Sequence, residues 1–582
     1  MLAFLYESPD ATDTRRTAVL FCPTFGWEEQ CSYRPLRVWS QTLARAGYPA
    51  ATFNLPGTGD SGGSPRDPGQ LETWTAAVSR AAEWLSGATG AARVCVVGIG
   101  LGGLLACRAI ASGAPIDDLV LWGVPAGGRL WLRELRTYAR MVAARRPEDH
   151  RPEIDDEGQR EYIGFVLTDE TTDELEALQL TDLAFPGAGD RRVLLLGRDG
   201  IPPDARLQEH LERAGAAVSV EDTDDYSALM LDPQLAQVPL ATIAKTMEWL
   251  AEAGAGSDSR SRRAAPRGPR LQLAGATAHR ASSTIELPWN GATVRETALS
   301  LGGPGGEMFA VLSESAVLDP APVCAVWLNG GALRHTGPNR AWVEAARRWA
   351  ARGVPTVRID LGGIGDSDGP EGCLGNPDLY APRRTQEVLA ALDQLSERGL
   401  PDRYMLGGLC SGAYWSLHAA LADKRVAGTL LINLYAFSWS EALVAERETA
   451  ESLAALRGYG WRRLARRDVR MRHVRLVASS LRPARVRTSA SHPVERGQSG
   501  QIELALDALR DQRTETLLLL ARGEGLHDQL RRQGVLAGLD RWPNLTVETI
   551  PSTDHMFRAL WLQRRVHASL DRALERVLGR FH

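Results

Sequence analysis

The segment that decides the fold is the apolar run Met405-Leu406-Gly407-Gly408-Leu409, followed by Cys410-Ser411-Gly412-Ala413 and then by Tyr414-Trp415-Ser416-Leu417-His418-Ala419-Ala420-Leu421. The first part has the composition of a buried strand and the last part that of a helix. Small residues two positions before and after Cys410 permit a tight turn that would hold its side chain exposed above a parallel sheet. A helix N-terminus there favours the thiolate. The alternative is a buried cysteine packed as a small hydrophobic residue.

The chain contains two copies of one pattern. Residues 44–61 match residues 350–367 at a constant offset of 306, which aligns Asn54 with Asp360 and Asp60 with Asp366. Residues 1–8 align with 308–315, and the glycine-rich segment 97–102 aligns with 407–412. We therefore expect a duplicated domain. The aspartate and serine that end each copy of this loop are predicted to cap the next helix.

Each copy alternates short β-type runs with segments of helix length, which is typical of a mostly parallel sheet with helices on both faces. The predicted strands of the first copy are residues 18–22, 50–54, 94–97, 119–122 and 193–196. Those of the second copy are residues 325–328, 356–359, 404–406, 429–432 and 516–520. Two more runs, Ser283–Leu287 and Thr293–Ala298, are predicted to open the second domain and have no counterpart in the first.

A segment without apolar periodicity separates the two copies. Residues 253–282 are rich in Gly, Ser, Pro and Arg in their first part, a composition typical of a flexible linker. The predicted domains are therefore residues 1–252 and 283–582. Each copy also carries an insertion before its later strands, at residues 124–191 and 434–513.

The glycine-bracketed cysteine resembles the nucleophile elbow of α/β-hydrolases, with cysteine in place of serine, as in the dienelactone-hydrolase branch. The stretch Cys22-Pro-Thr-Phe-Gly-Trp-Glu-Glu-Gln-Cys-Ser-Tyr-Arg34, with the elbow, is similar to hydrolases found beside exosortase, polyketide and nonribosomal-peptide systems. The resemblance implies two tandem α/β-hydrolase domains of the α/β class, each a mostly parallel sheet flanked by helices with a helical cap in its insertion. It also implies a catalytic triad in the chain order nucleophile, acid, histidine.

This order assigns the triad of the second domain. Cys410 would be the nucleophile, and His555, which follows the predicted last strand 546–550, would be the general base. Two acids follow the strand at residues 516–520, and we prefer Glu524 to Asp528 because Glu524 lies nearer the position where the family has its acid.

The oxyanion hole follows from the same resemblance. One donor would be the backbone N–H of Ser411, directly after the nucleophile, and the other the backbone N–H of Gly331 in the loop after the first core strand. The Ser411 side chain is expected to point away from the reacting carbonyl.

The first domain lacks the same machinery. Gly100 stands at the nucleophile position and Tyr226 at the histidine position, although Asp199 remains near the acid position. We therefore expect a degenerate, catalytically silent domain that serves as structural support, as a docking surface or as part of the pocket.

The nucleophile bears on the reaction. A thiolate exchanges readily with thioesters because nucleophile and leaving group have similar pKa values. We expect cysteine-dependent acyl transfer or thioester cleavage through an acyl-cysteine, in bacterial biosynthesis of polyketides or nonribosomal peptides, with the acyl group on an acyl or peptidyl carrier protein. An arginine-rich run between Arg457 and Arg487 would either dock that carrier or form a solvated helical face. The alternatives are an ester or lactone hydrolase and a non-catalytic scaffold.

The composition limits the partners, the compartment and the cofactors that we expect. A net charge of −4 gives no sign of nucleic-acid binding. No apolar run of 18 residues is present, and the N-terminal segment lacks the basic flank of a signal peptide, so we expect a soluble cytoplasmic protein without membrane contact. Seven scattered cysteines without Cys-x-x-Cys spacing indicate no metal site, and no cofactor is expected.

Overall fold

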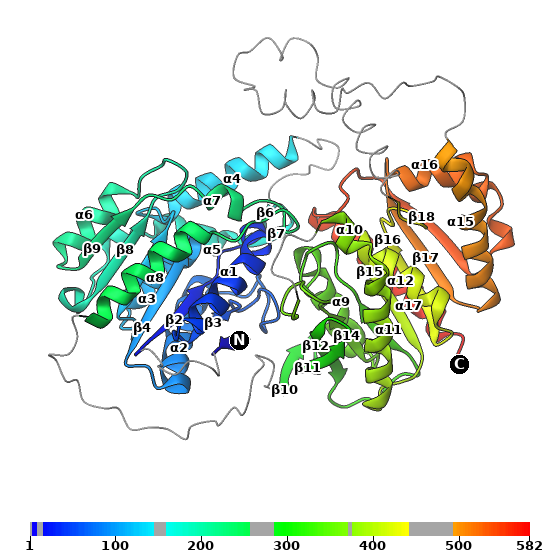
Figure 1. Ribbon diagram of the computed structural model, residues 1–582, viewed down its shortest axis with the longest axis horizontal. Helices are drawn as coiled ribbons and strands as arrows, with labels where there is room; N and C mark the ends of the chain where they lie inside the picture. Colours follow the sequence, from blue (N-terminus) through cyan, green and yellow to red (C-terminus); the bar gives the residue numbers. More distant parts are fainter. Residues whose placement is uncertain are drawn as a thin grey trace, which may run out of the picture.

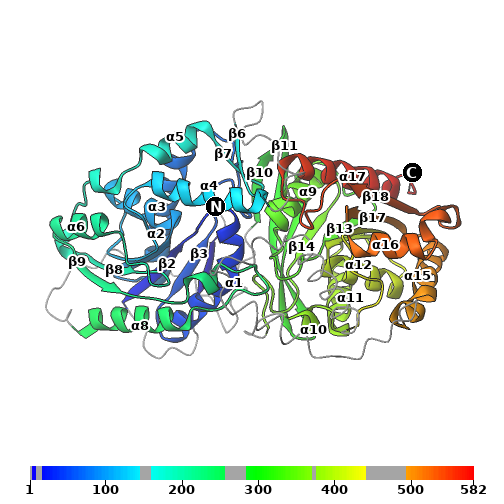
Figure 2. The ribbon, with the colours of Figure 1, turned by 90° about the horizontal axis from the view of Figure 1, so that it is seen from above.

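The computed structural model describes residues 3–7, 16–144, 159–255, 284–369, 375–440 and 493–581. These residues form two lobes that lie side by side, each built on its own sheet (Figures 1 and 2). Helix α8 (Leu240–Ala255) runs three residues into the predicted linker, and the rest of the linker lies outside the described residues. None of the described helices combines the length and the hydropathy needed to cross a bilayer.

The first sheet has seven strands in the order β1-β3-β2-β4-β5-β8-β9, all parallel except β1, which is antiparallel to β3. The strands are β1 (Ala3–Tyr6), β2 (Thr17–Cys22), β3 (Ala50–Phe53), β4 (Arg93–Ile99), β5 (Asp118–Trp122), β8 (Arg192–Leu196) and β9 (Ala217–Glu221). The helices are α1 (Trp27–Arg45), α2 (Gln70–Thr89), α3 (Leu101–Ala111), α4 (Gly128–Ala143), α5 (Asp169–Ala177), α6 (Ala205–Arg213), α7 (Tyr226–Leu229) and α8.

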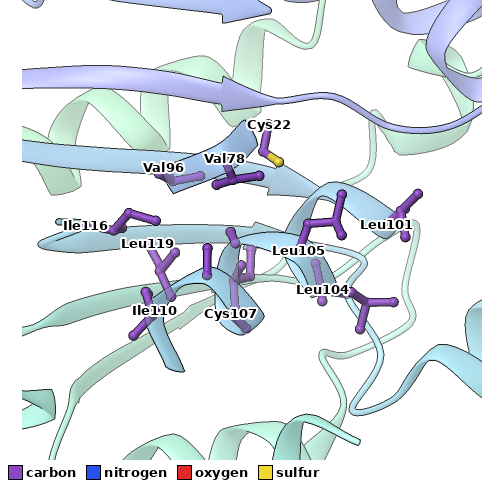
Figure 3. Close-up of a cluster of buried hydrophobic side chains, with 14 of the residues drawn as sticks. Cys22, Val78, Val96, Leu101, Leu104, Leu105, Cys107, Ile110, Ile116 and Leu119 are labelled. Atoms are coloured by element: carbon purple, nitrogen blue, oxygen red, sulfur yellow. The ribbon is translucent and has the colours of Figure 1, made fainter. Parts of the chain in front are cut away.

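Alternation along the strands gives this sheet two covered faces. Ala18, Leu20 and Cys22 of β2 point into the cluster formed with α2 and α3, whereas Val19 and Phe21 point into the cluster formed with α1 and α8. Because both faces are buried, β2 is a continuous apolar run rather than an alternating one. Figure 3 shows part of the α2 and α3 side, with Leu101, Leu104, Leu105, Cys107 and Ile110 of α3 near Cys22, Val78, Val96, Ile116 and Leu119.

The second sheet has nine strands in the order β10-β11-β12-β14-β13-β15-β16-β17-β18. Neighbours from β10 to β14 pair antiparallel and the rest pair parallel. The strands are β10 (Thr284–Trp289), β11 (Ala292–Gly303), β12 (Gly306–Ser315), β13 (Cys324–Trp327), β14 (Thr356–Ile359), β15 (Tyr404–Leu409), β16 (Val426–Ile432), β17 (Glu515–Ala521) and β18 (Leu545–Ile550). The helices are α9 (Ala341–Ala350), α10 (Asn376–Leu379), α11 (Pro382–Glu397), α12 (Ser411–Ala422), α15 (Pro493–Asp511), α16 (Gly525–Arg532) and α17 (Leu560–Leu578).

The two sheets confirm the predicted α/β class and the duplicated pattern. Each predicted core strand overlaps an observed one, and β1 pairs with β3 as β12 pairs with β14. In the second domain α11, α12 and α15 cover one face, and α9 and α17 cover the other. Strands β10 and β11 have no counterpart in the described part of the first domain.

The two insertions differ in how much is described. The first holds α4 and α5 as expected, but also the hairpin β6 (Gln159–Tyr162) and β7 (Phe165–Thr168), so this cap is not purely helical. In the second, residues 441–492 lie outside the described residues, and with them the arginine-rich run 457–487. Helix α15 forms the last part of this insertion, and it packs against the sheet as a core helix.

The predicted capping role of the repeated Asp-Ser pairs is wrong. The helices that follow begin only at Gln70 and Asn376, and all four side chains are buried. Asp60 accepts hydrogen bonds from His335 Nε2 at 2.8 Å and from the Arg358 guanidinium. Asp366 accepts from the Tyr33 hydroxyl at 2.8 Å. Each copy of the loop therefore binds the other domain, which the pattern within one copy could not show.

Backbone groups of the same loops complete this interface. Arg347 donates to the carbonyl oxygens of Asp60 at 2.7 Å and Ser61 at 3.3 Å, and Arg37 donates to that of Ser367 at 2.5 Å. Each of the duplicated loops thus binds side chains of the other domain.

His335 makes stability at this interface depend on pH. Its imidazole lies between Asp60 and Asp360, with Nδ1 2.7 Å from Asp360. Burial opposes the charged ring, but the two carboxylates outweigh it and raise the pKa of His335 to about 10. The unfolded chain should titrate near 6.5, so this contribution is complete below that pH and is lost as pH rises toward 10.

We therefore expect the free energy of unfolding to fall between pH 7 and about pH 10 by more in the wild type than in His335→Gln. Denaturant titrations at both pH values check this. Equal losses in the two proteins would contradict a charged, interface-stabilising His335.

Candidate active site

The predicted elbow is present at the carboxyl end of β15. Cys410 lies between β15 and α12 with φ 58° and ψ −109°, a strained conformation for a residue with a side chain. A Cβ on Gly412 would lie 2.0 Å from the Asn329 carbonyl oxygen, and a Cβ on Gly408 would lie 2.5 Å from the Gly412 carbonyl carbon. Glycine at both positions lets the backbone turn tightly and leaves Cys410 partly exposed.

The structure brings His555 and Glu524 together from the ends of two adjacent strands. His555 lies five residues after β18, and its Nδ1 is 2.7 Å from Glu524 Oε1, three residues after β17. Asp528 instead lies within α16, where its carboxylate contacts Arg531 at 3.1 Å. The carboxylate that orients the histidine is therefore Glu524.

Asn433 links the loop that carries His555 to the end of β17, which precedes Glu524. This residue was not predicted from the sequence. Its Nδ2 donates to the His555 carbonyl oxygen at 2.6 Å, and its Oδ1 accepts from the Ala521 backbone N–H at 2.6 Å. Its position directly after β16, at the same sheet edge as Cys410, is the signal that could have found it.

The electrostatics favour a thiolate–imidazolium pair. Burial opposes ionisation of the Cys410 thiol, but the charge of His555 and hydrogen bonds from His555 and Tyr380 outweigh it and lower the pKa of Cys410. Burial likewise opposes the charged ring of His555, and Cys410 and Glu524 outweigh it and raise the pKa of His555 well above its ordinary value. Both shifts favour a negative charge on Cys410 beside a proton on His555.

One of the two predicted oxyanion donors is already engaged. Ser411 begins α12, so its backbone N–H has no acceptor within the helix and remains suited to the role. The Gly331 N–H donates to the Ser411 hydroxyl oxygen at 3.1 Å, because the Ser411 side chain turns back onto the loop after β13. The role of Gly331 as an oxyanion donor stays a prediction.

The first domain keeps the elbow without its chemistry. Gly100 has φ 51° and ψ −115°, the conformation of Cys410. Tyr226 packs edge-on against Trp122, with ring centroids 5.3 Å apart. Asp199 accepts a hydrogen bond from the Ser227 N–H at 2.9 Å. Glycine and tyrosine therefore stand where the second domain has Cys410 and His555, and the catalytic silence of the first domain stays a prediction.

The first domain contacts the loop that carries His555. Met556 packs against a cluster formed by Trp27, Cys31 and Ile163 of the first domain. The hairpin β6–β7 also binds the start of α17, since the Leu560 N–H donates to Glu161 at 3.2 Å. The first domain thus packs against the loop that carries His555 in the second domain.

A cluster of ligand-type side chains lies at the domain interface. His335, Asp360 and Asp366 have ligand atoms within 4.8 Å of one another. Both ring nitrogens of His335 are already bonded to carboxylates, and Arg334 and Arg358 add positive charge beside Asp60. These residues do not fit a metal cation, and they serve the interface instead.

The strand order and the strained elbow between strand and helix define the fold: two tandem α/β-hydrolase-fold domains, with Cys410 at the elbow of the second.

Comparison with known proteins adds these findings. No family model and no curated protein matches the sequence. Among similar solved structures, a serine hydrolase without lid from Xanthomonas campestris is 17% identical, covering 48% of this chain and 94% of that one, with a TM-score of 0.28. A hypothetical protein from Pseudomonas aeruginosa is 19% identical, covering 42% and 88%, with a TM-score of 0.30. Est1E from Butyrivibrio proteoclasticus with ferulic acid is 14% identical, covering 43% and 95%, with a TM-score of 0.30.

Proposed function

We propose that the second domain is an enzyme that transfers or hydrolyses acyl groups through a covalent acyl-Cys410 intermediate, with an acyl thioester as donor. The observation that carries the proposal is the 2.7 Å contact between Glu524 and His555 beside a cysteine whose pKa is lowered. A general base oriented by a carboxylate and next to a thiol is the arrangement that activates cysteine nucleophiles.

The reaction proceeds in two half-reactions. The Cys410 thiolate attacks the carbonyl carbon of the thioester, and the resulting oxyanion is stabilised by the Ser411 N–H. Collapse breaks the bond to the donor thiolate, which takes the proton from the His555 imidazolium. An amine, an alcohol or water then gives its proton to neutral His555 and attacks the acyl carbon, and the electron pair of the broken C–S bond returns to Cys410.

A thioester donor suits this nucleophile best. Thiolate exchange between two thiols of similar pKa is close to balanced, so the acyl-enzyme can form reversibly and await its acceptor. In bacterial biosynthesis of polyketides and peptides such donors are held on carrier proteins, and we propose a carrier-bound acyl group as the substrate. Ester or lactone hydrolysis would use the same residues and differs in donor and acceptor.

Intact-protein mass spectrometry tests the proposal. Wild type, Cys410→Ala and the matched control Cys324→Ala, whose buried thiol has a raised pKa, are incubated with a panel of acyl thioesters. We expect an acyl adduct on wild type and Cys324→Ala and none on Cys410→Ala. Discharge faster with an amine or alcohol than with water indicates a transferase, and discharge by water alone a thioesterase. A folded wild type that forms no adduct with any donor would contradict the proposal.

A further inference from the structure

Tyr380 is a polar group at the nucleophile that the triad does not include. It lies between α10 and α11, far from the elbow in sequence, and its hydroxyl oxygen is 3.4 Å from Cys410 Sγ. The residue is buried, so this hydroxyl has left bulk water. A thiolate carries no hydrogen to donate, and the phenol is therefore the donor whenever the sulfur is charged.

The position of this hydroxyl is fixed from several sides. The Tyr380 ring is parallel to that of Trp439, with planes 4° apart and centroids 5.7 Å apart, and edge-on to that of Tyr414 at 5.1 Å. The backbone next to it is held because Trp415 Nε1 in α12 donates to the Leu379 carbonyl oxygen at 2.5 Å. Helix α12 begins directly after Cys410, so donor and nucleophile are positioned by the same element.

We propose that Tyr380 is a further catalytic residue, whose hydroxyl donates a hydrogen bond to the Cys410 sulfur whenever that sulfur carries negative charge. This inference rests on the proposed acyl-cysteine chemistry. It adds a neutral hydrogen-bond donor to the charged partner that His555 provides for the Cys410 sulfur.

The hydroxyl acts at two points of the cycle. In the resting enzyme it stabilises the thiolate, so more of the cysteine is ionised at neutral pH. When the acceptor has attacked the acyl-enzyme, the C–S bond breaks and its electron pair returns to Sγ beside the same hydroxyl. The tyrosine thus improves Cys410 as a leaving group, and it transfers no proton in either step.

The test compares Tyr380→Phe with wild type and with the control Tyr404→Phe. Tyr404 lies at the end of β15 opposite Cys410, and its buried hydroxyl donates to the Leu392 carbonyl oxygen. Alkylation of the Cys410 peptide by iodoacetamide is measured against pH. We expect the midpoint to rise by about one pH unit in Tyr380→Phe and to stay unchanged in Tyr404→Phe. Discharge of a preformed acyl-Cys410 adduct should slow by about tenfold in Tyr380→Phe alone.

The outcomes separate the two proposals. A wild type whose Cys410 is neither alkylated at neutral pH nor acylated overturns the proposed function. A reactive wild type with an unshifted midpoint and unchanged discharge in Tyr380→Phe overturns only the role of Tyr380. If that variant does not fold, biosynthetic replacement of tyrosine by 3-fluorotyrosine gives a second measurement, because its hydroxyl is a stronger donor and should lower the midpoint. An unmoved midpoint there also overturns the role.

Discussion

Replacement of Glu524 by glutamine is expected to slow acylation of Cys410 by about 10²- to 10⁴-fold at neutral pH. The carboxylate accepts from Nδ1 of His555 at 2.7 Å and stabilises the imidazolium that faces the thiolate. Glutamine has the same shape without the charge and can present its N–H₂ group to the ring, which favours the wrong tautomer. The rate of acyl-adduct formation with one thioester donor, followed by mass spectrometry, gives the measurement.

Asp528→Asn is the matched control. This carboxylate lies on the first turn of α16 and contacts Arg531, so its loss should change the acylation rate by less than about twofold. A severe defect in Asp528→Asn with a near-normal Glu524→Gln would move the acid to Asp528 and refute the geometry of the pair.

The fold could be predicted because its determinants are local. Parallel strands buried on both faces are continuous apolar runs. The elbow needs glycine at Gly408 and Gly412 because a Cβ at either position would clash with the backbone. Glu524 and His555 could be placed because each follows a recognisable strand by a few residues. All of these features depend on the order of residues along the chain, so they can be predicted from one sequence.

Other contacts could not be predicted because they join segments far apart in the chain, and no sequence pattern links one segment to the other. Tyr380 is one tyrosine in a polar loop, and only the packing of α10 against α12 brings its hydroxyl to Cys410. The engaged Gly331 N–H depends on a side-chain rotamer of Ser411. The interface role of Asp60 requires a partner surface from the other domain, whereas the loop motif alone is equally typical of a helix cap.

The second large effect is expected at that interface. Asp60→Ala removes one carboxylate from each of two buried cations, His335 and Arg358, and leaves them Asp360 and Glu296. Breaking a buried ion pair costs about 3–5 kcal/mol, and the remaining partners favour the lower end of that range. The free energy of unfolding measured from the first denaturant transition should fall by this amount. Asp511→Ala breaks an exposed pair with Arg510 and should lower that free energy by less than about 1 kcal/mol.

The same substitution tests whether the first domain supports catalysis in the second. Its residues pack against Met556 and bind the start of α17, so a loosened interface should let the His555 loop move and should slow acylation of Cys410 even under conditions where Asp60→Ala remains folded. Acylation rates of Asp60→Ala and Asp511→Ala, measured well below the first transition, decide the point. If the domain interface orients the His555 loop, Asp60→Ala should lose both stability and acylation rate. A destabilised Asp60→Ala that acylates at the wild-type rate would mean that the first domain stabilises the chain without positioning the histidine.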